Sequence, residues 1–275
     1  MTVCIAAACE EQTDDPKIVW CTDVLISGAL GSAETMLKTR AISDKWRCLT
    51  AGKDSEILAT LQLLKVHFGS KQIDETNILA CTRAALNQRK REKANELTHG
   101  KFALSYDDFL MHGKTRLPND LFRGTAMEIE LIQIEAQFII IGYTEIGGAT
   151  IVQTDKRCSA SLKEDFATVG EGAYLAQASL LSRGHSYTNS FGKTLYNVYE
   201  AKKFSQGARS VGEITALSVF HKSGIFEFLL PNGVEFLDKK YQQSSRQWVS
   251  DFEPPDGIFQ QMYPIQTDKS NVRTA

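Results

Sequence analysis

The sequence contains neither the long apolar runs of membrane proteins nor the charge excess of nucleic-acid-binding proteins. No stretch of its 275 residues reaches the roughly 18 consecutive apolar residues that a transmembrane helix requires. The 31 lysines and arginines nearly balance the 33 aspartates and glutamates, so no broad basic surface is expected. These two absences lead us to expect neither a membrane nor a nucleic acid as a partner.

Motifs for metals, nucleotides and secretion are also missing. The six cysteines include no CxxC pair, and the five histidines are scattered without the spacing of zinc ligands. Gly170 and Gly172 lack the third glycine of a dinucleotide-binding fingerprint, and there is no P-loop. The N-terminal segment has neither the basic start nor the small-residue cleavage site of a signal peptide. We therefore expect no metal, no cofactor, reduced thiols and a cytoplasmic location.

The apolar residues that are present form a succession of strand and helix patterns. Short runs of small and β-branched residues predict strands, and apolar positions that recur every three to four residues predict helices. The expected strands cover 3–9, 18–22, 40–50, 129–141, 149–154, 214–220 and 224–230. The expected helices cover 54–68, 75–96, 173–182 and 193–204. The first two strands are close enough in sequence to pair as a hairpin.

The order of these elements predicts an α/β protein of the α+β type with one main domain. Strands and helices do not alternate strictly, which disfavours a doubly wound parallel sheet. A four-layer αββα sandwich fits better, with two antiparallel sheets stacked face to face and flanked by helix pairs. We expect this domain over 1–230, with an insertion at about 95–123 that is loop-rich over 106–121. A polar C-terminal extension, 231–275, is then available to wrap the surface or a neighbouring subunit.

Four residues at or near the ends of predicted strands form a candidate catalytic constellation. Thr2 opens the first strand, and removal of Met1 would turn its α-amine, with an ordinary pKa of about 7.7 to 8.0, into a base for its own hydroxyl. A buried Lys38 beside that amine would lower the amine's pKa by like-charge repulsion, while Asp23 pairs with Lys38 and keeps it charged. Gly52, between a strand and a helix, is placed to present its backbone N–H to a developing oxyanion.

This constellation resembles that of the proteasome β subunits and bacterial HslV, which are N-terminal-nucleophile hydrolases. The family begins its mature chain with Thr at the head of a strand and ends the next strand with Ala or Cys, a small residue and Asp. A Lys follows at the end of the next loop, and Ala-Gly precedes the first long helix. The matching residues are Thr2, Cys21-Thr22-Asp23, Lys38 and Ala51-Gly52. The resemblance continues at 169–174 and 211–212, and covers about 2–230.

The resemblance also implies further site residues and shows two departures from the family pattern. Glu171 stands where the family usually has Ser between two glycines, and it becomes a candidate to bind the α-ammonium of Thr2. The Asp that family members often carry before a late glycine turn is replaced near 208–210. Both family residues normally support the hydrogen bonds of the nucleophile. The implied substrate pocket is lined by Ile26, Met36, Arg40 and Thr50, with Asp54 at its back.

The first expectation is therefore a threonine-type peptidase that cleaves amide bonds through an acyl-enzyme intermediate. The resemblance implies peptides or unfolded polypeptides as substrates and a homo-oligomer, such as a closed ring, while an ATPase partner stays unspecified. Two alternatives stay open. One is a non-catalytic, proteasome-like subunit for assembly or binding, which the two departures and a retained Met1 would favour. The other is a small-molecule amidase on the same fold.

Overall fold

Two antiparallel sheets form the centre of the protein. The computed structural model describes residues 2–28, 31–34, 38–69, 72–144, 148–208, 211–244 and 252–262. The six-stranded sheet has the order β10 (Phe166–Gly170), β1 (Val3–Cys9), β2 (Lys17–Asp23), β11 (Thr215–His221), β12 (Phe226–Leu229), β13 (Phe259–Met262). The five-stranded sheet has the order β5 (Thr39–Ala41), β6 (Trp46–Gly52), β7 (Ala136–Tyr143), β8 (Ala149–Thr154), β9 (Ala160–Lys163). A separate pair consists of β3 (Leu25–Gly28) and β4 (Gly31–Glu34).

The first strand explains why the six-stranded sheet is apolar on both faces. Successive side chains of a strand point to opposite faces. One set from β1 packs against apolar side chains of the five-stranded sheet and consists of Cys4, Ala6 and Ala8. The other set packs against helices and consists of Val3, Ile5, Ala7 and Cys9. The continuous apolar run of this strand is therefore a consequence of burial on two sides.

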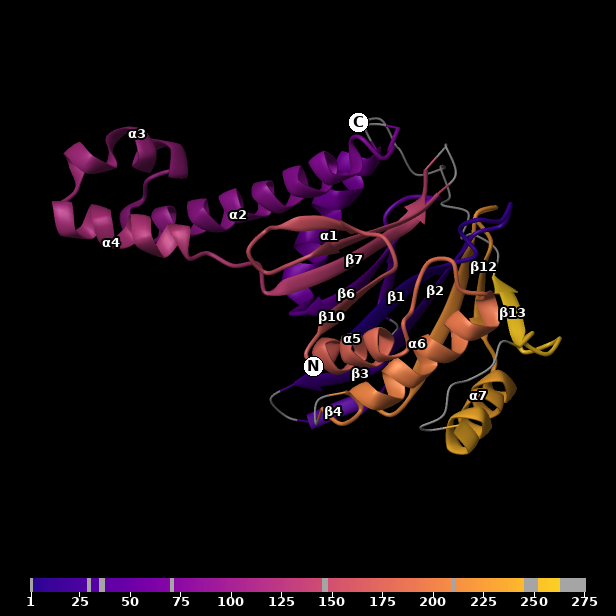
Figure 1. The fold of residues 1–275 in the computed structure, drawn as a ribbon. Helices are drawn as coiled ribbons and strands as arrows, with labels where there is room; N and C mark the ends of the chain where they lie inside the picture. The colour runs from indigo at the N-terminus through magenta and orange to yellow at the C-terminus, as the bar shows by residue number, and fades with distance from the viewer. Residues whose placement is uncertain are drawn as a thin grey trace, which may run out of the picture.

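Helices cover the outer faces of both sheets (Figure 1). Apolar residues of α1 (Asp54–Gly69) and α2 (Ile78–Phe102) pack with β6, β7 and β8 of the five-stranded sheet. Those of α5 (Ala173–Ser182) and α6 (Phe191–Ser205) pack with β1, β2 and β11 of the six-stranded sheet. The predicted mixed α/β class with antiparallel sheets is confirmed, and so are the hairpin of β1 with β2 and the four predicted helices, of which the one expected over 75–96 spans Ile78–Phe102.

The segment predicted to be a loop-rich insertion is helical, so that prediction is wrong. It forms α3 (Tyr106–Arg116) and α4 (Asn119–Glu130), which together with the outer part of α2 project away from the sheets (Figure 1). The Ser105 hydroxyl accepts a hydrogen bond from the Asp108 N–H and caps α3. Phe109 is buried in a small separate core, and its ring stacks on Phe122 at 5.1 Å. The predicted strand over 129–141 begins later, at Ala136.

The C-terminal region is partly built into the fold. After β12, α7 (Pro231–Ser244) places the fully buried Leu237 in the core beneath the six-stranded sheet. Further along the chain β13 pairs with β12, as in the register of Phe228 with Gln260. Within the extension predicted over 231–275, the described residues add a helix and an edge strand to the domain.

Membrane-spanning helices are not found in the part of the chain that the structure describes. The longest helix there, α2, has 25 residues but carries many charged side chains.

Candidate active site

Thr2 lies at the head of β1, where backbone packing holds it closely. Its neighbour Val3 pairs with Gly170 at the end of β10. Gly170 has a φ of +98°, and a Cβ at that position would lie 2.2 Å from the carbonyl oxygen of Thr2. The Gly172 N–H donates to the same oxygen at 3.4 Å. A glycine is therefore required at 170, and the Thr2 side chain is only 7% exposed.

Asp23 ends β2 and receives hydrogen bonds on both carboxylate oxygens. Its side chain is fully buried. Oδ1 accepts the N–H of Val3 at 3.0 Å, and Oδ2 accepts the N–H of Gly212 at 3.3 Å. Because these donors come from β1 and from the segment before β11, the carboxylate joins both neighbours of its own strand beside Thr2. A buried carboxylate requires such hydrogen bonds together with a cation.

Lys38 supplies that cation and links the carboxylate to the threonine. Its Nζ donates to Asp23 Oδ1 at 2.9 Å and also to the hydroxyl oxygen of Thr2. The Lys38 side chain is nearly as buried as its partners. Its carbonyl accepts two hydrogen bonds from Thr50 on β6, from the N–H at 2.9 Å and from the hydroxyl at 3.1 Å. The structure thus brings together the three predicted residues Thr2, Asp23 and Lys38 from three separate segments.

Cys4, one turn of the pleat away from Thr2, does not compete as a nucleophile. Its thiol donates to the carbonyl oxygen of Thr50 at 3.5 Å. Burial, and next to it the negative charge of Asp23, raises the pKa of this thiol well above its usual value. The thiol is therefore neutral at neutral pH, in line with the interpretation of the cysteines as packed core residues.

Gly52 is the last residue of β6 and is exposed. Its φ is +129°, and a Cβ there would lie 2.2 Å from the carbonyl oxygen of Glu135 in the segment that leads into β7. The crowding that requires glycine therefore comes from the backbone of the adjacent segment. Gly52 follows Thr50 by two residues on the strand that contacts Lys38, and its role as an oxyanion donor stays a prediction.

Glu171 occupies the turn between β10 and α5, and its side chain is exposed. Its flanking glycines contact Thr2 or its neighbour, whereas its own carboxylate makes no hydrogen bond or ion pair with another residue in the described part of the chain. The expected contact between Glu171 and the α-ammonium of Thr2 stays a prediction.

The five predicted pocket residues are only partly described. Thr50 is buried, and its hydroxyl donates a hydrogen bond to the Lys38 carbonyl, so it positions the lysine. Arg40 is half-buried on β5, where its Nη1 donates to the Thr39 carbonyl at 3.2 Å, and Asp54 is exposed at the start of α1. Ile26 belongs to β3, but its side chain is outside the described features, and Met36 lies outside the described residues.

Neither a scan of protein-family models nor a search of curated proteins finds a match to this chain. The contacts of Thr2, Asp23 and Lys38 therefore carry the functional argument.

One residue near the constellation was missed in the sequence. Lys202 on α6 is 0% exposed, and its Nζ donates to the carbonyl oxygen of Gly212 at 2.7 Å. The same Gly212 donates its N–H to Asp23. A lysine next to the apolar face of a predicted helix was the available signal, but the pattern also fits a lysine that reaches solvent.

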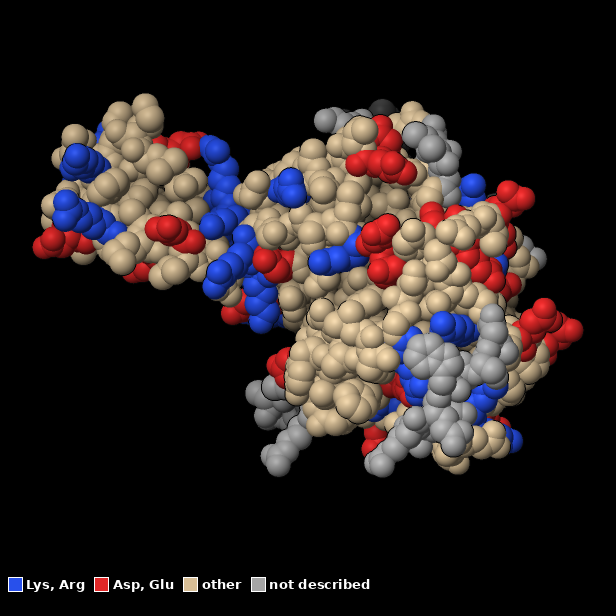
Figure 2. Space-filling view, in the orientation of Figure 1, with Lys and Arg blue, Asp and Glu red and all other residues tan. Residues whose placement is uncertain are grey.

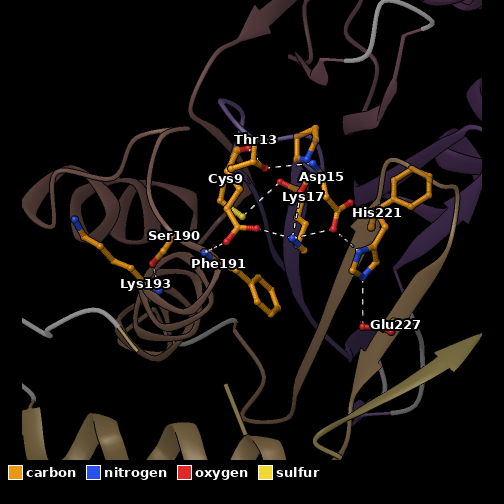
Figure 3. Close-up of polar contacts among 12 residues, drawn as sticks. Cys9, Thr13, Asp15, Lys17, Ser190, Phe191, Lys193, His221 and Glu227 are labelled. Carbon is orange, nitrogen blue, oxygen red and sulfur yellow. Dashed lines mark hydrogen bonds and ion pairs between the residues drawn. The ribbon is translucent and has the colours of Figure 1, made fainter. Parts of the chain in front are cut away.

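A second cluster of charges lies at the opposite end of the β1–β2 hairpin (Figure 3). The Lys17 ammonium contacts the carboxylates of Glu10 at 2.5 Å and Asp15 at 3.1 Å. The other Glu10 oxygen accepts the N–H of Phe191 at 3.0 Å, and His221 lies between Asp15 and Glu227. This cluster connects the hairpin loop to α6 and to β11 and β12.

Charges of both signs are interspersed over the face of the protein shown in Figure 2. One network on α1 and α2 combines Arg89 and Lys93 with the nearly buried Glu56, at 3.0 and 3.4 Å. These contacts connect α2 to the first turn of α1.

Proposed function

We propose that this protein is an N-terminal threonine hydrolase that cleaves amide bonds. The observation that carries the proposal is the position of the Lys38 ammonium, which donates to both the Thr2 hydroxyl and the Asp23 carboxylate in a nearly water-free place. A buried cation bonded to a hydroxyl oxygen favours negative charge on that oxygen, which is what a nucleophilic threonine needs. The resemblance to proteasome β subunits and HslV points to the same chemistry.

The proposed reaction needs Thr2 with a free α-amine, which removal of Met1 provides. The amine takes the proton of Oγ1 as this oxygen attacks the substrate carbonyl carbon, and the Gly52 N–H donates to the resulting oxyanion. Breakdown of the tetrahedral intermediate moves the proton to the leaving amine and leaves an acyl ester on Thr2. Water, deprotonated by the same amine, then attacks the ester carbonyl, and the amine returns this proton to Thr2 Oγ1 as the acid product leaves. Asp23 stays paired with Lys38 throughout.

The fold that we propose is the four-layer αββα sandwich of the N-terminal-nucleophile hydrolases. It is supported by helices on the outer faces of two antiparallel sheets and by an apolar core between the sheets. With this fold we propose a peptide or unfolded polypeptide as substrate, a homo-oligomeric assembly and a cytoplasmic location.

The test is the intact mass of the purified full-length protein after incubation with an epoxyketone, a probe that reacts with both the hydroxyl and the free amine of an N-terminal threonine. We expect loss of Met1 and addition of one probe per chain. Thr2→Ala should add none, while Thr13→Ala, which changes a threonine in the exposed loop after β1, should label as the unchanged protein does. A chain that retains Met1 and adds no probe would refute the proposal.

A non-catalytic, proteasome-like subunit is the second candidate. It is favoured by the exposed side chain of Glu171, which has no described contact with Thr2. In that case the protein should form its oligomer normally and leave the probe unreacted, which size-exclusion chromatography beside the mass measurement would show.

A further inference from the structure

A buried lysine outside the catalytic constellation connects to it through one residue, Gly212. Lys202 projects from α6 toward the six-stranded sheet and is 0% exposed. Burial raises the pKa of the Cys21 thiol on β2 to about 12, and the positive charge of Lys202 opposes that rise. The charge of Lys202 therefore acts on Cys21, the residue two positions before Asp23 on β2.

The contact chain runs from Lys202 through Gly212 to Asp23. The Lys202 Nζ donates to the Gly212 carbonyl oxygen at 2.7 Å, and the Gly212 N–H donates to Asp23 Oδ2 at 3.3 Å. Asp23 Oδ1 in turn accepts from Lys38. One residue thus receives a charged donor on its carbonyl side and offers its amide to the carboxylate.

The segment that carries Gly212 also packs against a residue that contacts Thr2. The side chain of Val211 packs so closely on Gly172 that a Cβ at Gly172 would lie 2.7 Å from Val211 Cγ2. Gly172 itself donates to the Thr2 carbonyl. A shift of residues 211 and 212 would therefore change the surroundings of Asp23 and of Thr2 together.

Packing alone does not explain a lysine at this position. Its neighbours Val198 and Ala201 on α6 are fully buried and apolar. Burying an ammonium costs free energy even when it is hydrogen-bonded. A protein with an apolar side chain of similar length at such a position is often as stable or more stable. The lysine is therefore better explained by what its charge does than by the volume it fills.

We propose that Lys202 is a positioning residue of the threonine site. Its ammonium holds the carbonyl of Gly212, and the N–H of the same residue fixes the carboxylate of Asp23 in the orientation that binds Lys38 beside the Thr2 hydroxyl. Lys202 does not touch the reacting atoms, so it acts through Gly212 and Asp23. The catalytic consequence rests on the proposed function, whereas the structural link to Asp23 does not.

The kinetic test compares Lys202→Met with the full-length unchanged protein. We expect the maximal rate of epoxyketone labelling to fall about 10-fold or more, as is typical for residues that support a catalytic group from behind. The probe concentration at half-maximal rate and the melting temperature should change little. Leu195→Ala, at a fully buried position of α6 with an apolar side chain, is the control and should lower the melting temperature without lowering the labelling rate.

An NMR measurement tests the structural link without any activity. In ¹⁵N-labelled full-length protein, the Gly212 amide resonance should move in Lys202→Met and stay in place in Leu195→Ala. An unmoved Gly212 resonance, or an unchanged labelling rate in a chain that does label, would overturn the inference. If the unchanged protein never labels but the Gly212 resonance moves, the proposed function fails and the link from Lys202 to Asp23 stands.

Discussion

The two ends of the β1–β2 hairpin carry the same kind of ion pair in opposite surroundings. At one end Lys38 binds Asp23 with side chains that are 8% and 0% exposed. At the other end Lys17 binds Glu10 and Asp15 with side chains that are 15%, 24% and 58% exposed (Figure 3). The residue types are alike, so the two pairs differ only in burial and in the third partner, meaning the further group that each lysine binds.

The third partner determines what each pair can do. Burial alone would lower the pKa of Lys17, but hydrogen bonds with Glu10 and Asp15 outweigh burial and raise it. Lys17 has carboxylates and a backbone carbonyl as partners, and its pair holds the loop of the hairpin in place. Lys38 instead shares its ammonium between a carboxylate and the hydroxyl of Thr2. A lysine–carboxylate pair indicates a catalytic site only where the pair is buried from solvent and the lysine also contacts a nucleophilic group.

The largest effect that we expect comes from removing the ammonium at the buried end. Lys38→Met should lower the rate of probe labelling about 10²- to 10³-fold, because the developing charge on the Thr2 oxygen loses its charged donor. Lys17→Met removes the same functional group from the other end and should leave the rate unchanged. Equal rates for Lys38→Met and the unchanged protein, measured as mass addition over time, would mean that the two ends do not differ in chemistry.

The next effect concerns stability at the buried end. Asp23→Asn should lower the free energy of unfolding by about 3 kcal/mol, because Lys38 then remains buried without its counter-charge. Equilibrium denaturation in urea measures this change, and Asp15→Asn at the opposite end is the matched control with an expected change near zero. A loss below about 1 kcal/mol for Asp23→Asn would show that the buried pair is no more important to stability than an exposed one.

A third effect is a pH dependence that belongs to the opposite end. His185 lies there, where Nε2 contacts the Ala8 carbonyl at 3.2 Å, and burial lowers its pKa from 6.5 to about 4. The folded state therefore disfavours the proton that the unfolded state binds, so the stability from neutral His185 is complete above pH 6.5 and is lost as the pH falls toward 4. We expect the free energy of unfolding to drop by about 2 kcal/mol between pH 7 and pH 5 from this group.

Denaturation curves at pH 7 and pH 5 test that expectation. His185→Gln keeps a polar side chain but removes the titration, so its stability should depend less on pH over this interval. The same drop in the variant as in the unchanged protein would assign the pH dependence to other groups.

The smallest effect is expected from the exposed pair itself. Lys17→Met should change the free energy of unfolding by about 1 kcal/mol or less, because partly solvated ion pairs contribute little. A loss near that of Asp23→Asn in the same urea titration would remove the contrast between the ends.

The site residues could be predicted because strand ends are easy to recognise in this sequence. β1 and β2 are short apolar runs that stop at polar residues, and an antiparallel pairing of neighbouring strands brings Thr2 and Asp23 to the same end. The tight backbone contact that requires Gly170 could not be predicted, since it depends on β10 lying beside β1 across more than 160 residues of sequence.

Periodicity was less reliable where the environment of a helix differs along its length. The apolar residues of α1 include Leu58 and Val66, yet these side chains are 56% and 65% exposed. In the projecting segment the opposite error occurred, because α3 and α4 have few buried residues and their stability comes from a cap and from the rings around Phe109. A small local core leaves a weak sequence signal.

The sequence alone determined the antiparallel α/β class, the hairpin of β1 with β2, and the residue types that a threonine nucleophile requires, because these depend on short-range patterns. Only the tertiary structure decided that Lys38 is buried and contacts both Thr2 and Asp23. It also decided that Lys202 is linked to the Asp23 carboxylate through Gly212. Burial and the sharing of donors arise where distant segments pack together. The sequence does not show whether a given lysine or aspartate is exposed to water or buried.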